Sequence, residues 1–230
     1  MALDIGYGEV VAQQATAEQR IADEFIRLGG VAMRFAAVER IPRYADGRRE
    51  SDVEHSFMLS IIASELAAEH YPKLDTGLVA QFANVHDLVE LDTGDVPTFA
   101  LSEEELRQKS ANEERALQIL LQTLPPHTAR ILGRYERQEE PEARFVRAVD
   151  KLLPLVVDIH GDGIRVLCED YEVADVEGLT EAHRPHQVRF ERMFPEYPEL
   201  LGAHVLLTDM LAAKFAAQQH QYQPEAAIEL

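Results

Sequence analysis

The stretch VHDLVELDTGDVPT, residues 85–98, concentrates the groups of this chain that could do chemistry. It contains a His–Asp pair, His86 and Asp87, followed three residues later by Glu90. Imidazole beside carboxylate is a common ligand pair for a divalent transition metal. A side chain three residues from Asp87 lies on nearly the same helix face, so Glu90 can point at whatever the metal holds. The flanking positions are apolar, so we expect a core environment, in which carboxylates need a partner.

Two more residues could complete a metal site. His55 comes 31 residues before the histidine of this pair, and Asp150 comes 63 residues after its aspartate. If three helices pack together, two imidazoles and two carboxylates can meet at one point. Such ligands suit Mn, Fe, Co, Ni or Zn, and the absence of thiolates argues against a structural zinc site. Taken alone, Asp150 could simply pair with Arg147 or Lys151, so only the joint pattern indicates a metal.

The elements that must position these residues have helical periodicity. Apolar residues recur at intervals of three and four, and no alternating strand pattern with hairpin turns is evident. Thr16 is a suitable N-cap for the first helix, and Ser51 or Asp52 for the second. We therefore predict an all-α, single-domain fold of about seven to nine helices. The expected helices cover about 17–35, 52–70, 75–90, 102–124, 128–138, a segment opening at 141, 164–172, 180–193 and 199–219.

Length and composition are those of an ordinary globular protein, with 230 residues of which 46% are hydrophobic and 27% charged. We expect a weakly ordered leader over residues 1–15 and one domain over 16–222. No apolar run approaches the roughly 18 residues that span a bilayer, and the N-terminus lacks signal-peptide features, so we expect no membrane partner. The single cysteine, Cys168, fits a reducing cytoplasm.

The formal net charge of −19, from 41 acidic and 22 basic residues, narrows the range of partners. Such a surface repels polyanions, so we expect no nucleic acid polymer to bind. A small phosphorylated ligand can still bind in a local basic pocket. Residues 40–49 hold four arginines and are the one strongly basic stretch. Arg48 and Arg49 are best interpreted as surface side chains that pair with nearby carboxylates.

The joint pattern of a histidine, a His–Asp pair and a distant aspartate resembles the signature of the HD-domain metal-dependent phosphohydrolase superfamily. It is most similar to the 5'-deoxynucleotidase branch. There, an Arg–aromatic pair precedes a Glu-His-Ser helix start, and the His–Asp pair precedes a Glu and a Thr-Gly-Asp-hydrophobic-Pro-Thr turn. Here these elements are Arg43-Tyr44, Glu54-His55-Ser56, His86-Asp87, Glu90 and residues 93–98. The resemblance covers roughly residues 17–155, and the expected C-terminal helices over about 160–220 carry no diagnostic motif.

The resemblance also implies roles for individual residues. The implied metal ligands are His55, His86, Asp87 and Asp150, which would hold one divalent transition metal (Mn, Co, Ni, Fe or Zn). The implied catalytic residues are Glu90, as acid or base, and Asp95. The implied substrate contacts are Arg43, which would bind phosphate, with Tyr44, Asp95 and Thr98. The branch often has Trp where this chain has Tyr44, which leaves base and sugar selectivity open. The resemblance further implies a homodimer.

Together these observations predict a cytoplasmic phosphomonoesterase that hydrolyses (deoxy)nucleoside 5'-monophosphates to nucleoside and phosphate. One alternative keeps the metal but takes nucleoside triphosphates, alarmones or phosphonates as substrates. Another is a non-catalytic, nucleotide-sensing HD module, against which the presence of all four ligands and Glu90 argues. His183 and His186 lie three residues apart on one expected helix face and form only a weak candidate for an adventitious metal.

Overall fold

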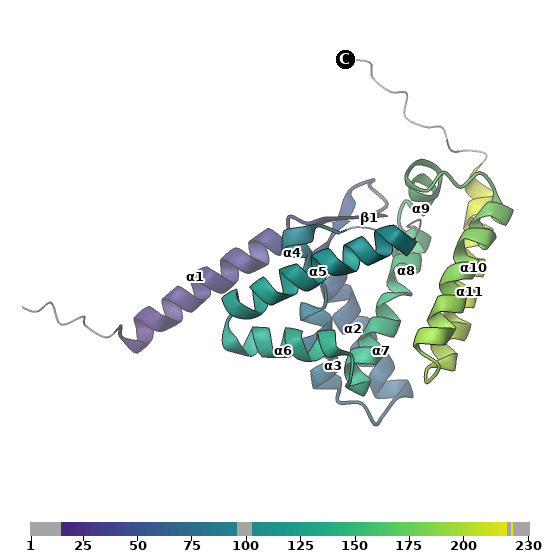
Figure 1. Cartoon of the computed structure of the whole chain (residues 1–230). Coiled ribbons are helices and arrows are strands. Elements are labelled where there is room, and N and C mark those ends of the chain that lie inside the picture. Colours follow the sequence, from purple (N-terminus) through teal and green to yellow (C-terminus); the bar gives the residue numbers. More distant parts are fainter. Residues whose placement is uncertain (1–14, 96–102, 220–221, 223–230) are drawn as a thin grey trace, which may run out of the picture.

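The computed structural model of the chain describes residues 15–95, 103–219 and 222. The described residues confirm the all-α prediction, with nine helices of eight or more residues and one small sheet (Figure 1). The predicted leader lies almost entirely outside them, as does Thr98. The helices are α1 (Ala17–Phe35), α2 (Asp52–His70), α3 (Thr76–Val85), α4 (Glu90–Thr93), α5 (Glu103–Thr123), α6 (Pro126–Arg137), α7 (Pro141–Asp150), α8 (Leu153–His160), α9 (Gly163–Arg165), α10 (Val176–Met193) and α11 (Pro198–Gln218), with a π-helical turn at Val166–Asp170.

Local sequence signals set the starts of the first two helices. Thr16 caps α1 and Ser51 caps α2, and each forms a reciprocal capping box with the residue three positions later, Gln19 and Glu54. The cap at Ser51 fixes where α2 begins. Its position therefore places His55 in the first turns of that helix.

The core has two connected parts. The larger surrounds α2, α3, α6 and α7, where Leu59, Phe82, Leu132 and Phe145 are fully buried. The smaller part lies among α8, the π-helical turn, α10 and α11. α10 and α11 run side by side at one end of the molecule (Figure 1). These two helices therefore cover one side of the helices that carry the predicted ligands.

A two-stranded antiparallel sheet replaces the irregular basic stretch that the sequence suggested. β1 (Glu39–Arg43) pairs with β2 (Arg49–Ser51), and Gly47 adopts a positive φ of 83° in the connecting turn. The buried positions of this hairpin include Arg40 and Glu50, which are charged. The strands therefore bury every second residue without showing the apolar alternation by which strands are recognised.

The helix predicted for residues 75–90 is shorter in the structure. α3 ends at Val85, residues 86–89 form turns, and α4 begins at Glu90. The imidazole Nδ1 of His86 lies 2.8 Å from the carbonyl oxygen of Ala83, the acceptor that a continuing helix would use for the amide of residue 87. Gly94, with φ of 70°, ends α4. The His–Asp pair therefore lies on a turn between two helices.

Two helices have largely exposed apolar faces. α1 extends away from the other helices, and Phe25 and Ile26 on it are 77% and 80% exposed (Figure 1). Contrary to expectation, α11 is long and apolar enough to cross a membrane by length and composition alone, which is weak evidence for a membrane segment. In this fold its buried face packs against α10 and α8 and includes the polar residues His204 and Thr208.

Candidate metal centre and active site

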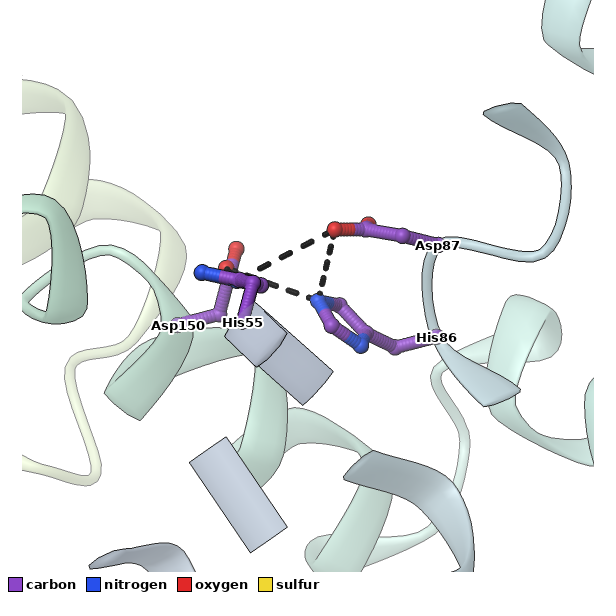
Figure 2. Close-up of side chains that lie close together, drawn as sticks. All are labelled: His55, His86, Asp87 and Asp150. Carbon is purple, nitrogen blue, oxygen red and sulfur yellow. Dashed lines mark hydrogen bonds and ion pairs between the residues drawn. The ribbon is translucent and has the colours of Figure 1, made fainter. Parts of the chain in front are cut away.

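The structure brings His55, His86, Asp87 and Asp150 together at one point (Figure 2). One ligand atom from each of these side chains lies within 4.8 Å of the others. His55 comes from the first turns of α2, the His–Asp pair follows α3, and Asp150 is the last residue of α7. The C-terminal ends of α3 and α7 both meet the cluster, and helix C-termini carry partial negative charge that favours a cation.

Within the cluster, each of the two carboxylates lies close to both imidazoles. Asp87 Oδ2 lies 2.9 Å from His86 Nε2 and 3.9 Å from His55 Nε2. Asp150 Oδ1 lies 3.0 Å from His55 Nε2 and 3.6 Å from His86 Nε2. The second carboxylate oxygen of Asp150 pairs with Lys151 at 2.5 Å, so the pairing considered from the sequence exists alongside the cluster.

Each imidazole is oriented by a second contact on its other nitrogen. His86 Nδ1 faces the Ala83 carbonyl oxygen at 2.8 Å, and His55 Nδ1 lies 3.5 Å from Oε2 of the fully buried Glu50. A proton on Nδ1 leaves the lone pair of Nε2 for the cluster. Such outer contacts on ligand histidines are the usual means of fixing tautomer and ring orientation at metal sites.

The charges of the buried carboxylates favour a cation within the cluster. Burial alone would lower the pKa of His86, but the carboxylates of Asp87 and Asp150 raise it to about 10. Although burial opposes it, the imidazole of His86 in turn holds the pKa of Asp87 well below its usual range. His86 Nε2 is buried and has no aligned hydrogen bond, despite its proximity to Asp87. Two imidazoles and two carboxylates in this arrangement fit a divalent transition metal.

Arg40, which the sequence did not single out, is a buried cation that lies directly against this cluster. Its Nη1 lies 2.8 Å from Asp87 Oδ2, 3.1 Å from Asp52 Oδ1 and 3.6 Å from Glu90 Oε2. Its Nε lies 3.4 Å from Glu50 Oε2. The guanidinium therefore lies against four carboxyl groups. The signal that could have found it is its strand position, since Arg40 occupies an inward-facing site of β1.

Arg43 and Tyr44, the residues selected from the sequence as substrate contacts, lie elsewhere on the hairpin. Arg43 Nη2 faces Asp170 Oδ2 at 3.4 Å, and the Tyr44 ring lies under the guanidinium of Arg48, 4.6 Å from its centre. Neither residue lines the cavity that adjoins the four-residue cluster. The structure therefore places Arg40, three residues earlier, where Arg43 was expected.

Glu90 is the buried carboxyl with the most perturbed environment beside the cluster. It is 6% exposed, and its Oε2 has no hydrogen-bond partner. Burial, together with the carboxylates of Asp87 and Asp95, raises the pKa of Glu90 to about 11 against the opposing effect of Arg40. Burial likewise raises the pKa of Asp95. In the metal-free protein, Glu90 therefore holds a proton at neutral pH.

A cavity of about 280 Å³ adjoins the cluster. Side chains from both parts of the core line it, with α8, α10 and α11 supplying much of the wall. The lining beside the cluster consists of Arg40, Asp87, Glu90, Asp95, Asp150 and Lys151.

A sequence model of the HD domain family matches residues 35–189, an interval that contains all four clustered residues. The chain belongs to the HD domain family. HD phosphohydrolases are metal-dependent, in keeping with the donor set described above. The chain is therefore a metal-dependent HD phosphohydrolase by family.

Individual HD proteins resemble this chain over different lengths. It is 30% identical to the 5'-deoxynucleotidase HDDC2 of Bos taurus and 29% identical to that of Homo sapiens, over 138 residues in each case. These matches cover 56% of this chain and only 62% of each relative. A predicted metal-dependent phosphohydrolase from Magnetospirillum magnetotacticum MS-1 has a similar crystal structure, with a TM-score of 0.59 and 25% identity, covering 86% of this chain and 98% of that one.

Proposed function

We propose that this HD domain protein hydrolyses (deoxy)nucleoside 5'-monophosphates to nucleoside and phosphate. The observation that carries the proposal is the four-residue cluster with Arg40 and the buried Glu90 beside it, all at a small cavity. The partial similarity to two 5'-deoxynucleotidases supports the substrate class. His55, His86, Asp87 and Asp150 would hold the ion.

The chain's own residues can perform the remaining tasks. A divalent ion bound at such a site acidifies water and neutralises phosphate charge. The shortest contacts of Arg40 with the neighbouring carboxylates are made by its Nη1 and Nε, and the residue lines the cavity. Its guanidinium would bind a phosphate oxygen there, in the planar geometry that arginine offers to phosphate. We therefore assign phosphate binding to Arg40 in place of Arg43.

Glu90 has the environment of a group that transfers protons. Because burial and neighbouring carboxylates raise its pKa, Glu90 is protonated before a cation arrives. A cation at the cluster lowers the pKa of a nearby carboxyl. Glu90 can thus accept the proton of the attacking water and pass one to the leaving oxygen of the nucleoside. Asp95 lines the same cavity and would position the substrate or the water.

Cavity size favours a monophosphate over the larger substrates. The volume of about 280 Å³ lies just below the ~300–1,000 Å³ range of small-molecule sites. The distinguishing experiment compares the products released from nucleoside monophosphates, nucleoside triphosphates and guanosine tetraphosphate by metal-loaded protein. We expect inorganic phosphate from monophosphates. Pyrophosphate or triphosphate release from the larger nucleotides alone would replace this proposal with the triphosphate or alarmone alternative.

We further propose that the protein forms a homodimer through α1. The exposed apolar side chains of Phe25 and Ile26 support this assembly. The first half of α1 carries Glu18, Asp23 and Glu24 with one basic residue, Arg20, and the second half carries Arg27 and Arg34. Two antiparallel copies of the helix would therefore pair opposite charges around an apolar strip. This self-complementarity selects a second copy of the chain as the partner.

A further inference from the structure

The part of the cavity wall built by α8, α10 and α11 contains polar groups that the proposed hydrolysis does not use. Aromatic rings and polar side chains predominate there, together with Arg189 of α10, whereas ion pairs predominate beside the four-residue cluster. The residues that define it are Asp158 on α8, His183 and Phe190 on α10, His204 on α11, and Tyr171 and Phe194, which directly follow the π-helical turn and α10.

His204 is a buried hydrogen-bonding group in this wall without a protein partner on one nitrogen. The residue is 3% exposed, and its Nδ1 makes no hydrogen bond. Its ring is wedged between His183 and Phe190, with ring centres 6.0 Å and 6.1 Å away. Burial and the neighbouring histidine charge lower the pKa of His204 to about 4, so its imidazole is neutral at physiological pH. It can therefore recognise an uncharged polar edge.

Asp158 is the second such group. It is 7% exposed, and its Oδ1 has no hydrogen-bond partner. Lys214 binds the backbone carbonyl oxygens of Asp158, Ile159 and Gly161 at 2.7–3.0 Å. Gly163 packs so closely that a Cβ there would lie 2.6 Å from the Cβ of Asp158. These contacts hold the backbone and Cβ of Asp158 at the cavity, and its Oδ1 has no hydrogen-bond partner there.

Buried polar groups without partners are rare in folded proteins because each costs free energy, and a ligand that completes their hydrogen bonds removes that cost. Both groups lie in one cavity beside aromatic and aliphatic side chains. A flat, mostly apolar body with polar edges and a hydroxyl-bearing link to phosphate would satisfy this wall. A nucleoside has that shape, and a small aliphatic alcohol lacks the flat body.

We propose that this wall is the nucleoside-recognition site of the enzyme, in which His204 binds the edge of the base and Asp158 binds a sugar hydroxyl. The inference rests on the proposed function, since it assigns the leaving group of the same reaction. Burial raises the pKa of Asp158 to about 8, which lets the carboxyl either donate or accept a hydrogen bond near neutral pH.

The test compares a deoxynucleoside 5'-monophosphate with 2-deoxyribose 5-phosphate, which lacks the base, in four proteins. These are the wild type, His204→Phe, Asp158→Asn and the control His70→Phe, which replaces an exposed histidine at the end of α2. Phenylalanine keeps the ring packing of His204 and removes its nitrogens. We expect His204→Phe to lower the kcat/KM ratio of nucleotide over sugar phosphate about tenfold, through KM, as loss of one hydrogen bond in a buried site predicts. Asp158→Asn should raise KM for both substrates, and the control should change neither.

Calorimetric binding of the corresponding deoxynucleoside separates this inference from the proposed reaction. If the wild type hydrolyses neither ester but binds the nucleoside, and His204→Phe weakens that binding about tenfold, the proposed reaction fails and the recognition site stands. Equal loss of activity on both esters in His204→Phe, or unchanged nucleoside binding, would overturn the inference. A second equivalent of Zn²⁺, bound by the wild type and lost in His204→Phe, would instead identify a histidine metal site and also overturn it.

Discussion

Arg40 and His86 share one oxygen of Asp87: Arg40 Nη1 lies 2.8 Å from Asp87 Oδ2, and His86 Nε2 lies 2.9 Å from the same atom. The four-residue cluster is therefore joined to the hairpin by a buried ion pair. Through Glu50, the same hairpin also faces the other imidazole, that of His55. The short sheet between α1 and α2 thus supports the site from one side.

The first prediction concerns which arginine binds phosphate. Arg40→Lys keeps the charge but removes the planar fork, so we expect kcat/KM for nucleoside monophosphates to fall by at least about tenfold. The matched variant Arg43→Lys should keep kcat/KM near that of the wild type, because Arg43 pairs with Asp170 away from the cavity. Steady-state kinetics on both variants makes the comparison. A larger loss in Arg43→Lys would restore the sequence-based assignment.

The second prediction is that Glu90→Gln lowers activity but raises the stability of the metal-free protein. Loss of proton transfer in Glu90→Gln should lower kcat by ~10²–10⁴. Because burial raises the folded-state pKa to about 11, the unfolded chain releases this proton first, and the stability of the metal-free protein falls as pH rises above 4.5. Glutamine does not titrate, so the variant avoids this loss of stability at high pH. Metal-stripped Glu90→Gln should therefore have a higher Tm than the metal-stripped wild type at pH 8, and a smaller advantage at pH 6. A lower Tm at pH 8 would contradict the account.

Sequence periodicity and capping signals predicted most of the helices because these depend on local patterns, and the joint pattern of histidines and aspartates predicted the cluster. The capping box at Ser51 and the apolar spacing of α2, α3 and α7 predicted helices that do bring His55, His86 and Asp150 together. Their metal-binding role stays a prediction. Glu90 is buried as the apolar flanking residues led us to expect, but a turn at residues 86–89, not a continuous helix, places it beside the cluster, and its catalytic role stays a prediction.

What the sequence did not predict depends on burial of charge and on tertiary packing. Arg40 and Glu50 alternate inward on a hairpin, but charged residues carry no hydrophobic signal, so the strands were interpreted as a loop. His204 and Asp158 lie in segments without a motif, and only the packing of α11 against α10 and α8 brings them to the cavity. The nucleoside wall therefore could be found only in the folded chain.

A third prediction concerns acid stability. Burial is the larger cause, and repulsion from neighbouring histidines the smaller one, that lowers the pKa of His183 and His204 to about 4. Between the ordinary pKa of about 6.5 and this lower value, the unfolded chain binds more protons than the folded one, so stability falls as pH falls. His204→Phe should therefore lose less Tm than the wild type between pH 6.5 and 4.5. An equal or larger loss in the variant would contradict the neutral state of this imidazole.

A fourth prediction concerns assembly. Phe25→Asp places a charge in the centre of the apolar face of α1, and we expect it to convert a dimer into a monomer in sedimentation analysis. Glu65→Ala, on the outer surface of α2, is the control and should leave the dimer intact. A wild-type monomer at micromolar concentration would remove the dimer proposal. A dimer that persists in Phe25→Asp would place the interface elsewhere.

The most direct test of the central claim measures phosphate release from deoxynucleoside monophosphates by metal-stripped protein, before and after adding Mn, Co, Ni, Zn or Mg. We predict no release without metal and release with at least one of these ions. The same assay on Asp150→Asn, with folding checked by circular dichroism, should show loss of both release and ion binding. Undiminished release after chelation, or a fully active and metal-binding Asp150→Asn, would contradict a metal centre built from these four residues.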